Sequence, residues 1–323
     1  MAQRSRDSIA EAVAALRAGG IVAFPTETVY GLGADARSSA AVKKIYAAKG
    51  RPATNPSIVH IRDGESARRY AAKWPEAAEK LAAAFWPGPL TLVLEKNDII
   101  VPEATAGRKT VALRVPDHPV ALELLTTFDG PIAAPSANRS GRISPTTAEH
   151  VRKELGGRVD FVLDGGACRV GVESTVLDLS GLRPVILRPG GISRAEIEKI
   201  VGPVDVAEAP ISEGEAAASP GMQAVHYSPT TPTYRFDAGH GNSLASGLKG
   251  RKAVALLFKE EPLPTEFRII LLPGDANAYA RRLYAALHEA DGQNAAAILI
   301  QMPPDEPAWV AVRDRLKRAS KYL

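Results

Sequence analysis

The sequence is poor in cysteine, in aromatic residues and in long apolar runs. Its one cysteine, Cys168, excludes an intrachain disulfide and a zinc site built from several cysteines. The six histidines show no pairing at metal-ligand spacing. No apolar run approaches the length of a membrane span, and the N-terminus lacks the apolar core of a signal peptide. We therefore expect a cytoplasmic protein without a membrane partner.

The remaining composition is that of an ordinary globular protein. Hydrophobic residues make up 45% of the chain and charged residues 24%. The formal net charge of +4 suits anionic substrates or transient contact with nucleic acid, although an ordinary basic surface explains it equally well. No tract rich in lysine and arginine marks a nucleic-acid-binding arm. The length of 323 residues leaves room for two domains.

Apolar periodicity predicts mixed helices and strands in the first two thirds of the chain. The predicted helices lie at 9–16, 42–46 and 76–85, and the predicted strands lie at 21–24, 57–61, 90–94, 110–115, 131–134, 161–163, 174–179 and 185–187. Two pairs, Thr146 with Glu149 and Ser193 with Glu196, fit capping boxes that open later helices.

The composition changes after residue 203. Residues 207–233 are rich in proline, alanine, serine, glycine and glutamate and lack an amphipathic period, which is typical of a linker. Beyond them, strands are predicted at 253–258, 268–272 and 296–300, and helices at 278–289 and 308–319. This pattern predicts a small parallel-sheet α/β domain. We expect a first domain at 1–205, a linker at 206–233 and a second domain at 234–323.

Polar residues of different chemistries are concentrated between Phe24 and Ile61, at turns between short apolar runs. Thr26 and Thr28 flank Glu27 just after a predicted strand, where α/β sheets usually bind ligands. A packed core has no need of this mixture. The segment is typical of a scaffold that presents groups to a small, polar ligand.

A basic turn, Lys49-Gly50-Arg51-Pro52, follows the second predicted helix. The point charge of lysine and the planar fork of arginine together suit a polyphosphate. A basic helix end that interacts with the helix dipole is the alternative. The turn is not a Walker A loop, because no glycine-rich run precedes a lysine followed by serine or threonine.

Asn55 and His60 flank the apolar centre of the next predicted strand. Ile58 and His60 share one face of it, because side chains alternate with a period of two. A lone histidine on a strand is more often a hydrogen-bonded core group than a catalyst. The nearby Lys49 and Arg51 favour a binding site here.

Arg114 lies on a strand between apolar neighbours and needs a partner if it is buried. A structural carboxylate and a substrate carboxylate or phosphate both satisfy that need. Further polar residues follow or open later strands, and each alone fits an ordinary turn. They are Ser136, Ser144, Ser174 and Arg188.

Taken together, the motifs resemble a known family. FPTETVYGLGADA, KGRPATNPSIVH, WPGPLTLVL, TVALRVPDHP, APSANRSGRISPT, GVESTVLDLS and LRPGGI occur in the order seen in threonylcarbamoyl-AMP synthases. The chain resembles the long form of that family. The resemblance implies an α/β fold with an N-terminal YrdC-like catalytic domain, whose twisted mixed sheet has a concave basic cleft. A long linker joins it to a smaller Rossmann-like α/β domain.

The resemblance also implies a reaction. Such enzymes are nucleotidyltransferases that combine L-threonine, bicarbonate and ATP into threonylcarbamoyl-adenylate and pyrophosphate. The product serves N6-threonylcarbamoyladenosine formation in tRNA through a downstream transferase complex, so tRNA is an indirect partner. Mg²⁺ is expected with the ATP, without a dedicated metal site or an organic cofactor.

Residue roles follow from motif position. The residues implied for L-threonine are Thr28, His60, Arg114, Ala134 and Ser174. Those implied for ATP are Lys49, Arg51, Asn55, Thr110, Ser136, Ser144, Arg188 and Tyr227. Lys49 and Arg51 are also expected to be catalytic, through charge neutralisation on the phosphates. Tyr227 is expected to close over the nucleotide as part of a lid.

One departure from the family concerns the linker, where Gln223, Ala224 and Val225 replace the usual basic residues. Two alternatives to the synthase also follow. A hydrogenase-maturation carbamoyl transferase shares the YrdC-like domain, but its zinc-finger cysteines are missing here. An RNA-binding module of the same fold would bind through phosphate contacts, without turnover of a nucleotide.

Overall fold

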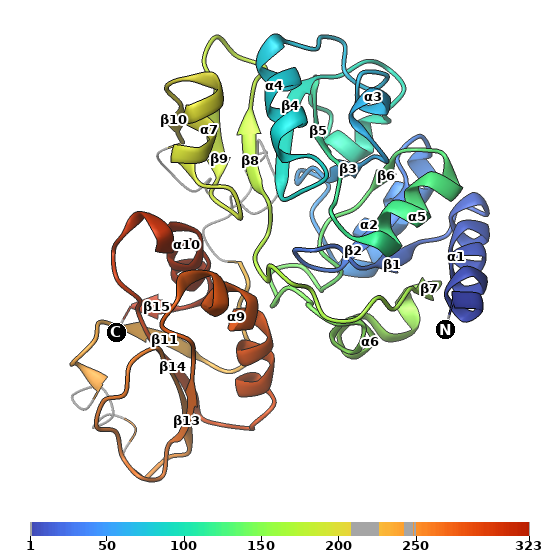
Figure 1. Cartoon of the computed structure of the whole chain (residues 1–323). Coiled ribbons are helices and arrows are strands. Elements are labelled where there is room, and N and C mark those ends of the chain that lie inside the picture. The colour runs from blue at the N-terminus through green and yellow to red at the C-terminus, as the bar shows by residue number, and fades with distance from the viewer. Residues whose placement is uncertain (1, 208–225, 242–247, 249, 323) are drawn as a thin grey trace. The chain divides into compact units, whose positions relative to one another are not determined.

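The computed structural model describes residues 2–207, 226–241, 248 and 250–322, which form two compact units (Figure 1). The first unit holds the described residues of 2–140, 145–169 and 173–207, and the second holds 141–144, 170–172 and the described part of 226–322. Within the described residues, no helix is both long enough and apolar enough to cross a membrane.

The first unit is built on a mixed sheet of ten strands, in the order β10-β9-β8-β4-β5-β3-β6-β2-β1-β7. The strands are β1 Val22–Phe24, β2 Gly31–Asp35, β3 Ile58–His60, β4 Leu90–Glu95, β5 Thr110–Arg114, β6 Ile132–Ala133, β7 Phe161–Val162, β8 Thr175–Asp178, β9 Val185–Arg188 and β10 Asp205–Val206. β5 is parallel to β3 and antiparallel to β4, and β4 is parallel to β8. The mixed sheet expected from the sequence is confirmed.

The helices of this unit are α1 Ala2–Arg17, α2 Ser39–Lys49, α3 Gly64–Ala67, α4 Glu76–Phe85, α5 Pro119–Phe128, α6 Ala148–Leu155 and α7 Arg194–Val201, with short 3₁₀ turns η1 Pro102–Thr105 and η2 Gly156–Arg158. Gly50 caps the C-terminus of α2, and its φ of 61° is left-handed and favours glycine. The capping box of Ser193 and Glu196 at α7 is confirmed.

The capping box expected at Thr146 is wrong by one residue. Thr147 caps α6, because its side chain accepts a hydrogen bond from the backbone N–H of His150. Thr146 lies one residue too early and is held differently. Its backbone oxygen accepts a hydrogen bond from Cys168 N, and its hydroxyl lies 3.4 Å from His150 Nδ1.

The two faces of the central strands differ in character. Val59, Leu92 and Leu113 lie on the face covered by α4 and α7, which contribute Leu81 and Ile197 to the same core cluster. The opposite face carries a small apolar cluster of Ile58, Val93, Ala112 and Val176. Because side chains alternate along a strand, the second face also holds the polar residues that flank this small cluster.

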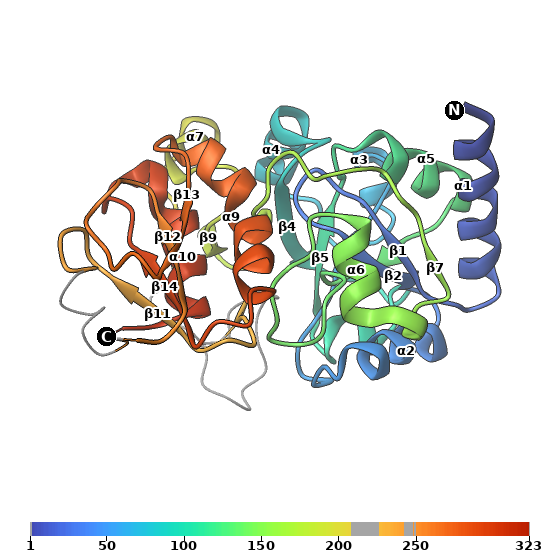
Figure 2. The same ribbon diagram turned by 90° about the horizontal axis from the view of Figure 1, so that it is seen from below.

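Helices also cover the other end of the sheet. On one side, α1 and α5 pack together through Leu16 and Leu124 (Figure 1). On the other side, α2 and α6 supply Ile45 and Val151 to a core with Leu32 of β2 (Figure 2). These layers fix β1 and β2, and with them the turn that carries Thr26–Thr28.

The second unit contains a five-stranded sheet in the order β13-β12-β14-β11-β15, in which every strand pairing is parallel. The strands are β11 Thr233–Phe236, β12 Ala253–Leu257, β13 Arg268–Leu271, β14 Ala297–Gln301 and β15 Lys321–Tyr322, and the described helices are α9 Ala276–Asp291 and α10 Val310–Ala319, the latter preceded by the 3₁₀ turn η4 Pro307–Trp309. The predicted parallel α/β domain is confirmed.

Two short segments from the middle of the chain belong to this second unit. Ser228 N donates a hydrogen bond to Gly141 O, and a side chain at Gly171 would collide with the backbone of α9 at Ala280. β10 still pairs with β9 of the first sheet, and β11 begins at Thr233. Most of the predicted linker, including Gln223–Val225, lies outside the described residues.

Candidate active site

Polar side chains form a row across adjacent strands on the less apolar face of the first sheet. His60 and Arg114 end the parallel strands β3 and β5 and are paired in register. Thr91 at the start of β4 lies at the same end, with its hydroxyl 2.7 Å from that of Ser174. Arg188 of β9 donates to the Ser174 hydroxyl at 3.2 Å. The strand order therefore collects residues from distant parts of the sequence.

The turn after β1 supplies the partners of Arg114. Nη2 of Arg114 lies 2.7 Å from Oε1 of Glu27 and donates to the hydroxyl of Thr28 at 3.0 Å. The Thr28 hydroxyl lies 2.8 Å from that of Thr26, which donates to Val29 O. The sequence left two partners open for Arg114, a structural carboxylate and a substrate group. The structure supplies the structural carboxylate, which is Glu27.

Glu27 is a site residue that sequence reasoning did not select. Its side chain is 1% exposed. An ionised carboxylate buried to this extent needs a cation beside it. The sequence carried one usable signal, a single acid between two threonines directly after a buried strand. The pairing with Arg114 could not be deduced from it, because the two residues are far apart in the chain.

His60 is a neutral hydrogen-bonding group. The side chain is buried, and burial, followed by the nearby positive charge of Arg114, lowers its pKa to about 3. Nδ1 has no hydrogen-bond partner among the described residues, and the ring packs edge-on against Phe24 at 5.6 Å. His60 shares its face of β3 with Ile58, as the alternation predicts.

Ala134 lies beside the start of β3, because β6 is antiparallel to β3 and pairs Ile132 with His60 and Ala133 with Val59. Ala134 N donates to Ile58 O at 2.8 Å, which fixes the chain after β6 against β3. Of the five residues expected to bind threonine, His60 and Arg114 end neighbouring strands, Ala134 and Ser174 directly adjoin β6 and β8, and Thr28 lies on the turn bonded to Arg114. Arg188 was expected to hold the nucleotide, and the structure places it against Ser174 of the same group.

A second polar group surrounds the end of α2. Nζ of Lys49 donates to the backbone oxygens of Ser136 and Asn138, both at 2.5 Å. Arg51 donates from Nε to Asn55 O and from Nη2 to the backbone oxygen of Pro56. Burial, followed by the positive charge of Arg51, holds the pKa of Lys49 well below its usual range. An anion bound here would offset both effects.

The side chain of Asn55 is buried, and neither Oδ1 nor Nδ2 has a hydrogen-bond partner among the described residues. Buried amides almost always have partners, so this one favours a bound ligand. Asn55 precedes β3, and Thr110 begins β5, four residues and about 13 Å from Arg114. The two polar groups thus lie toward opposite ends of the same two strands.

Ser144 and Tyr227, the remaining residues expected at the nucleotide, belong to the second unit. The ring of Tyr227 lies 5.6 Å from that of Tyr284, and Nε2 of His288 lies 3.2 Å from Ser144 O. Tyr284 and His288 are one turn apart on α9, so the same stripe of this helix supports both segments. Their expected contact with a nucleotide stays a prediction.

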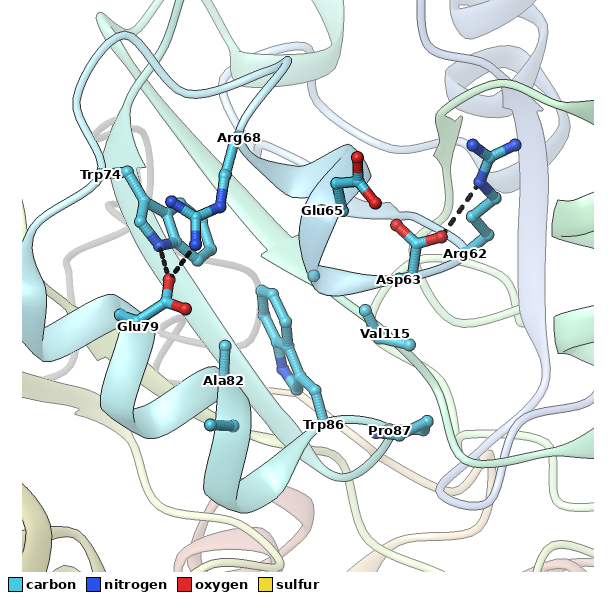
Figure 3. A pocket seen from close by; sticks show the side chains of 12 residues that line it. Arg62, Asp63, Glu65, Arg68, Trp74, Glu79, Ala82, Trp86, Pro87 and Val115 are labelled. Atoms are coloured by element: carbon cyan, nitrogen blue, oxygen red, sulfur yellow. Dashed lines mark hydrogen bonds and ion pairs between the residues drawn. The ribbon is translucent and has the colours of Figure 1, made fainter.

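A separate cavity of about 460 Å³ lies between α3 and α4 (Figure 3). Glu79 accepts hydrogen bonds there from Trp74 Nε1 and Arg68 Nη2, at 2.7 and 2.5 Å. Trp86 and Val115 complete its wall. None of the residues expected to bind threonine or ATP lines this cavity, so it lies outside the predicted site.

Within the described part of the chain, no group of three or more histidine, cysteine, aspartate or glutamate side chains could hold a metal ion. The polar group at α2 offers the Asn55 amide, whose oxygen has no hydrogen-bond partner among the described residues. Such a donor fits a magnesium ion held mainly by the phosphates of a bound nucleotide. Mg²⁺ stays a prediction.

Two family models cover nearly the whole chain. Residues 14–190 match the Sua5/YciO/YrdC family, described as telomere recombination, and residues 192–321 match the C-terminal domain of threonylcarbamoyl-AMP synthase. These matches define a two-domain protein with a YrdC-like first domain and a Sua5-type second domain, as expected from the motifs.

Individual relatives match over nearly the full length of the chain. The threonylcarbamoyl-AMP synthase of Bacillus subtilis is 43% identical over 97% of this chain and 92% of its own length, and that of Pyrococcus abyssi is 42% identical over 95% and 92%. The crystal structure of P. abyssi Sua5 complexed with L-threonine matches with a TM-score of 0.90 and 40% identity, over 98% of this chain and 96% of that one. The chain belongs to the threonylcarbamoyl-AMP synthase family.

Proposed function

We propose that this chain makes threonylcarbamoyl-AMP from L-threonine, bicarbonate and ATP on one face of its first sheet. Membership of the family supports the overall reaction, and a relative of known structure binds L-threonine, as its name states. The placement of two polar groups toward opposite ends of β3 and β5 supports the proposal most directly. One group suits an amino acid, and the other suits phosphates.

The amino acid binds at the end that carries Arg114. The guanidinium takes the substrate carboxylate, while Thr28, His60 and Ser174 form hydrogen bonds and Ala134 contributes its backbone. Neutral His60 can accept or donate without adding a second cation beside Arg114. This arrangement would orient the substrate amine, which must meet bicarbonate or CO₂ in a fixed geometry.

ATP binds at the other end, with its phosphates against Lys49 and Arg51. The polar neighbours that complete this group are Asn55, Thr110 and Ser136. Arg188 lies beside Ser174 at the threonine end, so its expected contact with the nucleotide stays a prediction, as do those of Ser144 and Tyr227. Magnesium bound to the phosphates would supply further neutralisation of charge. No covalent protein nucleophile is needed, because orientation and electrostatic stabilisation are the main demands of such phosphoryl chemistry.

The first step consumes the ammonium group of L-threonine and one bicarbonate ion. L-threonine and bicarbonate give a carbamate, one water and one proton, and a carbamate oxygen then attacks the α-phosphate with loss of pyrophosphate. Lys49 and Arg51 would neutralise the negative charge that gathers on the phosphates during this step. The adenylate passes to the transferase that modifies tRNA in the cytoplasm, so the chain meets tRNA only indirectly.

The test is pyrophosphate release by the purified full chain. Release should require L-threonine, bicarbonate and ATP together, and omission of any one should reduce it to background. L-Valine, which replaces the threonine hydroxyl by a methyl group, is the matched control and should support little release. ATP consumption that proceeds equally with and without L-threonine would contradict the proposal. Tight, strongly salt-dependent RNA binding without nucleotide turnover would favour the RNA-binding alternative.

A further inference from the structure

Glu27 and Arg114 form a buried ion pair, and the second carboxylate oxygen of Glu27 takes no part in it. Both side chains are nearly inaccessible, at 1% and 4% exposure. A buried ion pair costs desolvation energy that a well-packed apolar pair avoids, so the pair alone does not explain the acid. The remaining donors and acceptors of the two groups show what a ligand would meet.

Arg114 keeps one side of its guanidinium available. Nη2 is used by Glu27 and Thr28, and Nε donates to Gly88 O at 3.3 Å. Nη1 makes no hydrogen bond to any residue that the structure describes. A substrate carboxylate can therefore bind Nη1 without breaking the pair.

Glu27 offers an acceptor for a positively charged ligand group, as Arg114 offers a donor for a negatively charged one. Its Oε2 is buried and has no hydrogen-bond partner among the described residues. Three titratable groups face the acid, namely Arg114, His118 and Cys168. Burial lowers the pKa of His118 and raises that of the Cys168 thiol to about 12, so both are neutral near pH 7. Arg114 is the one cation among these groups, and it lies on Oε1.

We propose that Oε2 of Glu27 binds the α-amino group of the amino-acid substrate. This inference rests on the proposed function. An α-amino acid carries its ammonium and its carboxylate on one carbon, and the Arg114–Glu27 pair presents the two opposite charges side by side. Glu27 then selects α-amino acids and holds the amine in place. Conversion of the ammonium into an anionic carbamate removes that attraction and favours the cations at the other end of the strands.

A ligand cycle on the full chain tests this role. The ligands are L-threonine, 3-hydroxybutanoate (which lacks the amine) and L-threoninol (which lacks the carboxylate), and their affinities are measured by calorimetry. The wild-type chain should bind threonine at least about 30-fold more tightly than 3-hydroxybutanoate. Glu27→Gln should weaken threonine and threoninol by about 10- to 100-fold, but 3-hydroxybutanoate by less than about 3-fold.

Other outcomes separate the possible failures. If Glu27→Gln weakens all ligands that carry a carboxylate and spares threoninol, Glu27 only positions Arg114 and the inference is wrong. Equal wild-type affinities for threonine and 3-hydroxybutanoate overturn it without any variant. Glu79→Gln, which alters the exposed pair with Arg68, is the matched control and should change none of the affinities. Loss of threonine binding by the wild-type chain would instead contradict the proposed function itself.

Discussion

Replacing Arg114 by alanine should lower kcat/KM for L-threonine by about 100-fold or more and destabilise the first unit by about 3–5 kcal/mol. The substrate loses the donor for its carboxylate. At the same time, Glu27 is left as a buried charge without its cation, and the hydroxyl of Thr28 and the carbonyl of Gly88 lose their donor. Pyrophosphate release reports the first effect. Urea unfolding followed by the fluorescence of Trp74 and Trp86, measured in a Trp309→Phe background that removes the tryptophan of the second unit, reports the second.

A double variant separates these two effects. Arg114→Met combined with Glu27→Gln should recover most of the lost stability, because no uncompensated charge remains, yet it should stay inactive. Arg68→Ala breaks an exposed ion pair and should cost no more than about 1 kcal/mol. An Arg114→Ala chain as stable as the Arg68→Ala control would contradict the importance of the buried pair.

Lys49→Met should lower kcat/KM for ATP by about 100- to 1000-fold while it leaves the affinity for L-threonine within about 3-fold. The methionine keeps the apolar stem of the lysine but removes the amine that donates to the backbone oxygens of Ser136 and Asn138 and that a bound phosphate would keep charged. Lys44→Met is the matched control, because Lys44 lies on the same helix and donates to Gly19 O at the surface. A Lys49→Met chain with normal ATP use would contradict the assignment.

The lowered pKa of Lys49 predicts a second measurable effect, an uptake of protons when ATP binds. Without an anion, burial favours the neutral amine, whereas a bound phosphate favours the ammonium. At a pH above the lowered pKa, ATP binding should therefore take up a proton, and the uptake should fade as the pH drops below it. Titration calorimetry in buffers of different ionisation enthalpy measures this uptake, which should vanish in Lys49→Met and persist in Lys44→Met.

Local patterns were enough to predict several features. α4 spans residues 76–85, as periodicity predicts, because Pro75 precedes it and Trp86–Pro87 ends it. The alternation of side chains along a strand predicted that His60 shares a face of β3 with Ile58. The alternation of strands and helices along the chain predicted the parallel sheet of the second unit. Each depends on residues close together in the chain, which is where sequence patterns carry most information.

Long-range features escaped prediction for the same reason. α5 was not predicted, and its apolar face packs against α1, more than a hundred residues earlier. Glu27 was not selected, because its significance depends on Arg114. The position of Arg188 beside Ser174 follows from the strand order and a register shift between β8 and β9, which no local pattern encodes.

The central claim is that threonine and ATP bind at opposite ends of one sheet face. It is tested most directly by the separate affinities of Arg51→Ala and His60→Ala for L-threonine and for ATP, measured by titration calorimetry on the full chain. Arg51→Ala should weaken ATP by at least about 10-fold and threonine by less than about 3-fold, and His60→Ala should do the reverse. Equal losses of the same ligand in both variants would contradict the account.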